Sequence, residues 1–206
     1  MFLTVCSVIL VRFFHPPVTS FMLWKSSFLQ KKIDYNWIPI SKMGENITLS
    51  VVATEDSNFC NHIGVDIKEI YKVVTGGEKR GASTITQQLA KNLFLWSGRS
   101  WSRKMIEFYF TFLIETMIPK RRILEIYLNT VETSLLTFGV SKASEKYYKT
   151  ALNKLTKEQA IRIALTLPSP KYRNPRNLKS YLVKRISRLK KDMEILKKDD
   201  RSSCFL

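Results

Sequence analysis

Two adjacent carboxylates, Glu55 and Asp56, interrupt an apolar run in the stretch ATEDSNFCNHIG. On a helix, Glu55 shares a face with Val51 and Phe59, which lie four residues away on either side. A carboxylate beside apolar groups loses hydration and its pKa rises, so Glu55 is suited to act as a general base near neutral pH. Asp56 points about 100° away and can take a different role. The alternative is a pair of surface acids on an ordinary helix.

A second cluster lies in GASTITQQLAKNLF, where Thr84, Gln88 and Lys91 occupy positions i, i+4 and i+7. This spacing places a hydroxyl, an amide and an ammonium on one helix face, where they suit phosphate and sugar oxygens. The alternative is a capped amphipathic helix with its polar side in water. That alternative explains Thr84 but gives no reason for the amide pair.

A third cluster lies in GRSWSRKMIE, where Arg103 and Glu107 are four residues apart and close enough to pair. Arg99 and Lys104 add positive charge nearby. The alternative is a surface salt bridge on a core helix, worth less than about 1 kcal/mol.

The elements that must position these clusters are helical, because no run shows sustained apolar and polar alternation. The fold class predicted is all-α. Thr84 is expected to cap its helix with Gln87 as the reciprocal partner. The expected helices are 48–59, 84–96, 101–118, 120–129, 140–148, 157–167 and a last amphipathic one whose apolar face carries Leu178, Leu182, Ile186, Leu189, Met193 and Leu196. Segments 76–83 and 130–138 are expected to be loops.

The composition indicates a folded protein with a polyanionic partner, because 206 residues carry a net charge of +17. Nucleic acid, anionic lipid and a pyrophosphate substrate all satisfy that charge. The three cysteines are far apart and odd in number, so neither a disulfide framework nor a zinc site follows. The two histidines predict no metal site either, and the redox compartment stays undetermined.

The two ends of the chain raise separate questions. Residues 1–24 are apolar but interrupted, and we interpret them as part of a membrane anchor, followed by a linker over 25–47 and a globular domain over 48–200. The alternative for 1–24 is a buried N-terminal helix. Segment 171–201 holds twelve Lys and Arg against four Asp and Glu, which fits either a solvated helix face or contact with anionic lipid headgroups.

Five blocks taken in order carry a family resemblance: EDSNFCNHIGVD, GASTITQQLAKNLFLW, RKMIE, KRRILEIYLN and LPSPKYRNP. Together they resemble the peptidoglycan glycosyltransferase family over residues 51–175. LFLWSGRSW is similar to its monofunctional branch, which lacks a penicillin-binding domain. The resemblance implies a lysozyme-like helical fold with a small jaw that touches the bilayer.

The resemblance also implies the reaction and the residues. Glu55 matches the general base that deprotonates the 4-hydroxyl of an acceptor N-acetylglucosamine, which then displaces undecaprenyl pyrophosphate from the growing chain with inversion. Glu107 matches the second glutamate of the family, on the pyrophosphate side or supporting the site. The substrate-binding positions implied are Asp56, Phe59, His62, Thr84, Gln88, Lys91, Arg99, Arg103 and Lys104.

The chemistry of these residues agrees with the resemblance. A hydroxyl nucleophile needs one base, and a pyrophosphate leaves readily when cations neutralise its growing charge. A glycoside hydrolase would need two opposed carboxyl groups instead. Mg²⁺ or Mn²⁺ could share the neutralising role, although no dedicated ligand set is visible. The implied partners are lipid II, the growing glycan, the membrane and other proteins of cell-wall synthesis or division, with no nucleic acid.

The implied location is the inner membrane, with a single span and the catalytic domain on the periplasmic side. Phe94, Leu95, Trp96 and Trp101 suit a membrane interface, with core packing as the alternative. Lys25, Lys31 and Lys32 follow the apolar segment, so counting positive charges alone would place the domain in the cytoplasm.

The sequence departs from the family after YLNTVE, where a glycine-rich turn is expected. Ser134 and Leu136 stand in place of glycines, and Leu136 would be strained if its position requires a positive φ. Three hypotheses follow: an active glycosyltransferase, a non-catalytic membrane-anchored cell-wall scaffold, and a basic nucleic-acid binder. The last rests on charge alone, because no nucleic-acid-binding motif accompanies it.

Overall fold

The protein is helical, as the sequence predicts. The computed structural model describes residues 2–76, 81, 83–98 and 100–206. Within them the α-helices are α1 (Phe2–Phe13), α2 (Ser20–Leu29), α3 (Glu45–Glu55), α4 (Ile67–Thr75), α5 (Ile85–Phe94), α6 (Trp101–Met117), α7 (Lys120–Thr130), α8 (Val140–Tyr148), α9 (Lys157–Ala164) and α10 (Ser180–Lys198). Short 3₁₀ helices are η1 (Ile40–Lys42), η2 (Phe59–Asn61) and η3 (Leu152–Lys154), and strands β1 (Glu132–Ser134) and β2 (Thr137–Phe138) form one hairpin.

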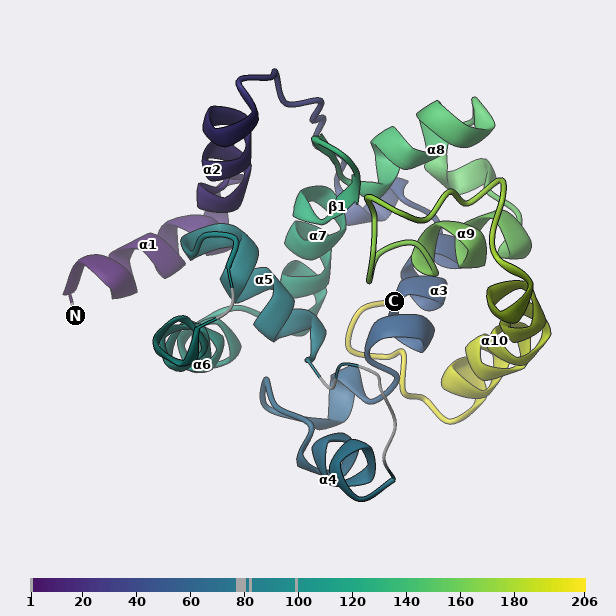
Figure 1. The fold of residues 1–206 in the computed structure, drawn as a ribbon. Coiled ribbons are helices and arrows are strands. Elements are labelled where there is room, and N and C mark those ends of the chain that lie inside the picture. Colours follow the sequence, from purple (N-terminus) through teal and green to yellow (C-terminus); the bar gives the residue numbers. More distant parts are fainter. Residues whose placement is uncertain (1, 77–80, 82, 99) are drawn as a thin grey trace.

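Helix α7 runs through the middle of the molecule (Figure 1), and its side chains from Ile123 to Leu128 are largely buried. Helix α5 packs on one side of it, with α6 against α5 and α1 against α6, and α8, α9, α3 and α10 lie on the other side. One large apolar cluster joins both sides. The two halves therefore share a core, which fixes α3 relative to α5 and α6.

The start of α5 forms as predicted. Thr84 accepts a hydrogen bond from the Gln87 backbone N–H, and the Gln87 side chain accepts one from the Thr84 N–H. This capping box satisfies two backbone donors that would otherwise be unpaired at the helix terminus. The first residues of α5 are consequently fixed where they face the end of α3.

Helix α3 is shorter than the predicted helix over 48–59. It begins at Glu45 and ends at Glu55, and the backbone of the C-cap residue Asp56 leaves the helical conformation, with φ −160° and ψ 69°. Phe59 therefore lies in the separate 3₁₀ helix η2, not four residues along the same helix face as Glu55. The Asp56 side chain accepts bonds from other parts of the chain, so the helix cannot continue through it.

The predicted loop over 130–138 is a small antiparallel hairpin, β1 paired with β2. Its edge is completed by a distant residue, because Asp34 donates to the Leu136 carbonyl and accepts from the Phe138 N–H. Leu136 has φ +56°, in the left-handed region where glycine is expected. Its side chain is buried with Phe21, Met22 and Phe138, and this packing stabilises a backbone that would otherwise be strained.

The N-terminal helices pack against the rest of the protein. Arg12 donates to the Met117 carbonyl at the end of α6, and Thr4 shares a hydrogen bond with Tyr109. In α2, Lys25 is buried and forms an ion pair with Glu132 of the hairpin. Among the residues described, we find no helix that has both the length and the apolar composition needed to cross a bilayer.

A disulfide joins Cys60 to Cys204, 144 residues apart in sequence. The expectation that no disulfide follows from the cysteines was therefore wrong. The pairing depends on the fold, because the segment after α10 turns back toward the middle of the molecule (Figure 1), where Cys204 meets Cys60 of η2. Cys6 remains a free thiol.

Helix α10 confirms the predicted apolar stripe. All six residues of the stripe are buried, from Leu178 before the helix to Leu196 near its end. They pack against α3 and α9. Most Lys and Arg residues of this helix are exposed on its opposite face.

Candidate active site

A cleft of about 660 Å³ lies where the end of α3 faces α5 and α6. Its walls also include the start of α4, the loop after α9 and one residue of α10, so six separate segments of the chain meet there. Eight of the residues that the sequence proposes line this cleft: Glu55, Asp56, Thr84, Gln88, Lys91, Arg103, Lys104 and Glu107. The three clusters quoted from the sequence therefore form one site.

Glu55 is the last residue of α3 and is partly buried. One carboxylate oxygen accepts a hydrogen bond of 3.0 Å from the Gln88 side-chain amide. Burial raises the pKa of Glu55 to about 7; the Gln88 hydrogen bond and the charges of Arg173 and Arg185 lower it, and nearby Asp56 raises it. At neutral pH Glu55 is thus present in both protonation states, which suits a group that accepts a proton.

Gln88 is held in its orientation by a second bond. Its side-chain oxygen accepts from the Tyr127 hydroxyl at 2.9 Å, so its NH₂ group must face Glu55. Tyr127 is fully buried, and burial together with the nearby charges of Glu55 and Asp56 raises its pKa well above the usual value. The phenol therefore stays protonated and serves as a fixed donor.

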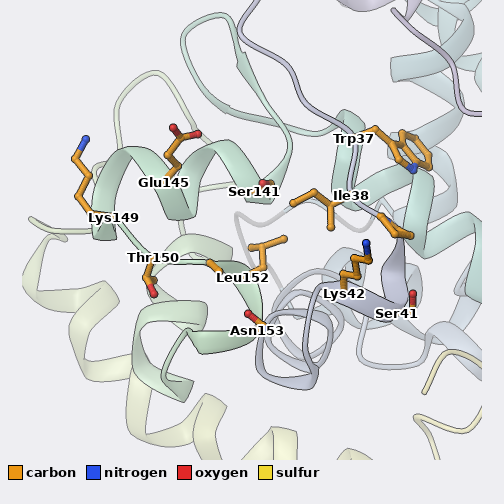
Figure 2. Close-up of a pocket in the computed structure, with 12 residues that line it drawn as sticks. Trp37, Ile38, Ser41, Lys42, Ser141, Glu145, Lys149, Thr150, Leu152 and Asn153 are labelled. Carbon is orange, nitrogen blue, oxygen red and sulfur yellow. The ribbon is translucent and has the colours of Figure 1, made fainter.

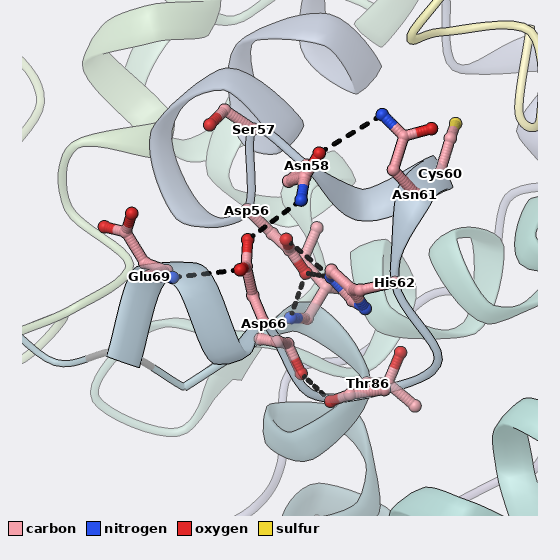
Figure 3. Close-up of polar contacts among 12 residues, drawn as sticks. Asp56, Ser57, Asn58, Cys60, Asn61, His62, Asp66, Glu69 and Thr86 are labelled. Carbon is pink, nitrogen blue, oxygen red and sulfur yellow. Dashed lines mark hydrogen bonds and ion pairs between the residues drawn. The ribbon is translucent and has the colours of Figure 1, made fainter. Parts of the chain in front are cut away.

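Asp56 performs a different task from Glu55. Its carboxylate binds the His62 Nε2 atom at 2.8 and 3.0 Å and accepts the Ile85 backbone N–H at 2.9 Å (Figure 3). It thereby joins the turn after α3 to the first residue of α5. A carboxylate at a helix N-terminus also interacts favourably with the helix dipole.

Phe59 and His62 lie behind the cleft and are not among the residues that line it. Phe59 is fully buried, and His62 is 9% exposed. Their rings are 6.3 Å apart in an edge-on arrangement. These two residues support Asp56 from within the core.

Thr84 lines the cleft, but its hydroxyl proton is already engaged. The hydroxyl donates to the Gly64 carbonyl at 2.6 Å while accepting from Gln87. The geometry thus gives Thr84 the role of fixing the start of α5. Arg99 lies outside the described residues.

The α5 and α6 side of the cleft carries most of the charge. Arg103 donates to Glu107 at 2.8 Å, and Lys104 forms an ion pair with the other Glu107 oxygen. Burial lowers the pKa of Lys91, with Glu107 the largest opposing influence and Arg103 acting in the same direction as burial. The buried Nε of Arg103 has no hydrogen-bond partner in the described part of the chain. Such a set of donors suits an anion with several oxygens.

Arg173 and Arg185 also line the cleft, although neither was predicted from the sequence to be a site residue. Arg173 is anchored by a 2.7 Å bond to the Leu165 carbonyl. Arg173 lies within the block LPSPKYRNP, and Arg185 lies within the basic segment 171–201. Those two signals were visible, but only folding places them opposite Glu55.

The described residues contain no group of three His, Cys, Asp or Glu side chains close enough to hold a metal ion. Asp66, which also lines the cleft, binds the Asn58 amide and caps α4 through the Glu69 N–H (Figure 3). The use of Mg²⁺ or Mn²⁺ stays a prediction.

A second hollow of about 820 Å³ lies between residues 37–42 and α8 with η3 (Figure 2). Trp37, Ile38 and Leu152 contribute apolar surface, and Glu145 is its one carboxylate among the residues described. None of the residues proposed from the sequence lines it. The cleft at Glu55 is therefore the candidate active site, because the residues suited to chemistry line it.

An exposed apolar surface adjoins the charged side of the cleft. On α6, Trp101 is 89% exposed and Phe112 is 62% exposed, and α1 packs beside them with Leu10 and Phe13 exposed. The four residues expected at a membrane interface are divided by the structure: Trp96 and Trp101 are exposed, Leu95 is buried, and Phe94 stacks on Phe110.

Comparison with known proteins gives consistent matches. A family model described as transglycosylase matches residues 25–194. A biosynthetic peptidoglycan transglycosylase of Marinomonas sp. (strain MWYL1) is 44% identical over 203 residues, which cover 97% of this chain and 88% of the relative. Proteins of the same name from Shewanella frigidimarina and Caulobacter vibrioides are 43% and 37% identical, over 90% and 97% of this chain and 82% and 89% of their own lengths.

Proposed function

The chain belongs to the transglycosylase family, and from this membership we propose that it polymerises lipid II into the glycan strands of peptidoglycan. The observation that carries the proposal is the cleft itself. A single carboxylate with a pKa of about 7, Glu55, shares it with the cations Lys91, Arg103 and Lys104. One base and a cationic cradle are what transfer from a pyrophosphate requires.

Glu55 accepts the proton in this mechanism. It takes the proton from the 4-hydroxyl of the acceptor N-acetylglucosamine as that oxygen attacks C1 of N-acetylmuramic acid on the growing chain. The bond from C1 to the pyrophosphate oxygen breaks on the opposite face, so the configuration at C1 inverts. Gln88 keeps the Glu55 carboxylate oriented through its 3.0 Å hydrogen bond.

The cations stabilise the leaving group. Negative charge grows on undecaprenyl pyrophosphate as the bond breaks, and Lys91, Arg103 and Lys104 supply donors for its oxygens. Glu107 holds two of these cations in place through its ion pairs. Arg173 and Arg185, at the other end of the cleft, are suited to the phosphates of the acceptor lipid II.

The exposed surface of α1 and α6 is suited to contact the membrane that carries the lipid chains. We place the domain on the periplasmic side. The Cys60–Cys204 disulfide supports this side, because disulfides persist in oxidising compartments and are rare in the cytosol. The disulfide argues against the cytoplasmic location that the positive charges of Lys25, Lys31 and Lys32 would favour.

The non-catalytic scaffold is the competing function, suggested by the altered turn at Ser134 and Leu136. That turn lies outside the cleft lining, and its substituted Leu136 is packed in a small apolar cluster. The altered residues therefore leave the reacting groups in place. This favours the enzyme.

The test is polymerisation of purified lipid II by the full chain in detergent or vesicles. We expect glycan strands from the wild type, sensitivity to a moenomycin-type inhibitor, and loss of product in Glu55→Gln with an unchanged circular dichroism spectrum. A wild type that leaves lipid II intact would establish the scaffold instead. Full activity in Glu55→Gln would overturn the assignment of the base.

A further inference from the structure

The segment 199–206, which follows α10, lies across the turn that carries Asp56. The disulfide fastens it through Cys204 to Cys60 in η2. Phe205, which is 1% exposed, packs its ring 6.3 Å from the ring of Phe59. A second attachment comes from Arg121 of α7, which donates to the carbonyls of Phe205 and Leu206. Segment 199–206 is thus bound to both η2 and α7.

The turn beneath this segment leads directly to the reacting groups. Phe59 lies under the Lys120 ammonium at 4.6 Å, and Lys120 donates to the His62 carbonyl at 2.8 Å. His62 in turn binds the Asp56 carboxylate, which holds the Ile85 N–H at the start of α5. Each contact is short and mostly buried, so a displacement at Cys60 or Phe59 reaches α5.

The start of α5 determines where Gln88 lies, and Gln88 holds Glu55. The segment 199–206 also reaches the cleft edge more directly, because Arg201 lies 3.5 Å from the Ser57 carbonyl, next to Asp56. Ser57 itself lines the cleft. The chain of contacts from Cys204 to Glu55 is therefore continuous through packed groups and hydrogen bonds.

We propose that segment 199–206, tied down by the Cys60–Cys204 disulfide, is a positioning element for the reaction, and that reduction of this disulfide to two thiols by an external dithiol, which is itself oxidised to a disulfide, lowers activity by loosening the Asp56 turn. Cys60, Cys204 and Phe205 are positioning residues, because none of them lines the cleft. Full activity would then require an oxidising compartment. The inference rests on the proposed function for its activity readout.

The experiment compares the oxidised full chain with the same protein after reduction and alkylation of the cysteines, and with the Cys60→Ser/Cys204→Ser double variant. We expect kcat/KM with lipid II to fall about tenfold in both altered forms, since small misplacements of catalytic groups are costly. The Cys6→Ser variant is the matched control and should retain wild-type activity when oxidised.

Two further readouts separate positioning from simple loss of folded protein. The Gln88 bond lowers the pKa of Glu55, so loosening it should move the rising limb of the pH profile to higher pH, whereas partial unfolding would leave the limb in place. Amide exchange at Ile85 should accelerate on reduction while exchange in α7 stays slow. A Phe205→Ala variant with the disulfide intact should show a smaller shift of the pH limb and a smaller acceleration of Ile85 exchange. Phe205→Leu should return both toward the wild-type values.

The outcomes are distinct. Equal kcat/KM and equal Ile85 exchange in oxidised and reduced protein would overturn the positioning role. If neither form polymerises lipid II, the proposed function fails, and Ile85 exchange alone then decides whether segment 199–206 holds the turn. A drop in activity with an unmoved pH limb and faster exchange throughout α7 would show general destabilisation and would also overturn the role.

Discussion

Glu55 and Glu107 line the same cleft, but their surroundings differ in charge. Glu55 receives one neutral hydrogen bond, from Gln88, and its burial raises its pKa to about 7. Glu107 is 4% exposed and pairs with two cations, Arg103 and Lys104. A desolvated carboxylate such as Glu55 exchanges a proton near neutrality, whereas both oxygens of Glu107 are engaged in ion pairs. In the function proposed above, one residue type thus serves as base at one end and as counter-ion at the other.

This contrast also bears on the class of reaction. A glycoside hydrolase needs a protonated carboxyl group opposite a carboxylate. Here both carboxylate oxygens of the second glutamate are engaged in ion pairs with Arg103 and Lys104. Its neighbours Lys91, Arg103 and Lys104 are suited to neutralise a phosphate instead. The difference between the two glutamates therefore supports transfer from a pyrophosphate over hydrolysis.

The largest effect is expected from Glu55→Gln. The amide keeps the shape of the side chain and an oxygen for the Gln88 bond, but it cannot accept a proton. We expect the initial rate of lipid II consumption to fall by about 10³-fold, within the usual range for loss of a general base. An unchanged thermal unfolding profile is the control for folding. A fall in this rate of less than tenfold would mean that Glu55 is not the base, and would contradict the contrast drawn between Glu55 and Glu107.

A smaller effect is expected from Glu107→Gln. The variant retains the positive charges of Arg103 and Lys104 but removes the carboxylate that orders them. We expect kcat/KM for lipid II to fall about 30-fold, since removing one partner of a buried charge pair typically costs a few kcal/mol. Steady-state kinetics measured beside Glu55→Gln would test the ranking. A loss equal to that of Glu55→Gln would mean that both glutamates take part in the chemistry.

The pH profile of kcat/KM should distinguish the roles of Glu55 and Glu107, whatever the size of the loss in activity in each variant. Glu55 must be deprotonated to act, so kcat/KM should rise about tenfold per pH unit below pH 7 and level off above it. Glu107→Gln should keep this limb at reduced height, and the residual activity of Glu55→Gln should lack it. A limb in Glu55→Gln identical to that of the wild type would assign the titration to another group.

Local patterns in the sequence predict much of this arrangement. The capping box at Thr84 and Gln87 depends on residues three apart, and the apolar stripe from Leu182 to Leu196 depends on helical periodicity. Both are set by the helix itself. The three chemical clusters could therefore be placed on the right helices, and the resemblance brought Glu55 and Lys91 into one site.

Features that depend on distant partners could not be predicted in this way. The hairpin after α7 exists because Asp34 completes its edge, and the disulfide pairs cysteines 144 residues apart. Arg173 shares the cleft with Glu55 because the loop after α9 forms part of the cleft wall. Neither the spacing of residues nor their helix and strand propensity predicts contacts between segments so far apart in the sequence. They follow from the shared core.

The smallest effect concerns stability. Replacement by Gln should change the free energy of unfolding in opposite directions for the two glutamates. The folded-state pKa of Glu55 is about 7, against 4.5 for the free side chain. The folded state therefore binds more protons than the unfolded state between these values, and the free energy of unfolding falls as pH rises through this window. The full cost is present above pH 7 and absent below about pH 4.

Glu55→Gln removes that cost, since an amide does not ionise. We expect its free energy of unfolding to match the wild type at pH 4 and to exceed it by about 1–2 kcal/mol at pH 8, after allowance for the partial exposure of Glu55. Glu107→Gln should instead lower it at pH 8, because two cations lose their buried partner. Urea unfolding at both pH values measures the differences. If Glu55→Gln lowers stability at pH 8, the Glu55 carboxylate is stabilised by its neighbours, and the contrast between base and counter-ion does not hold.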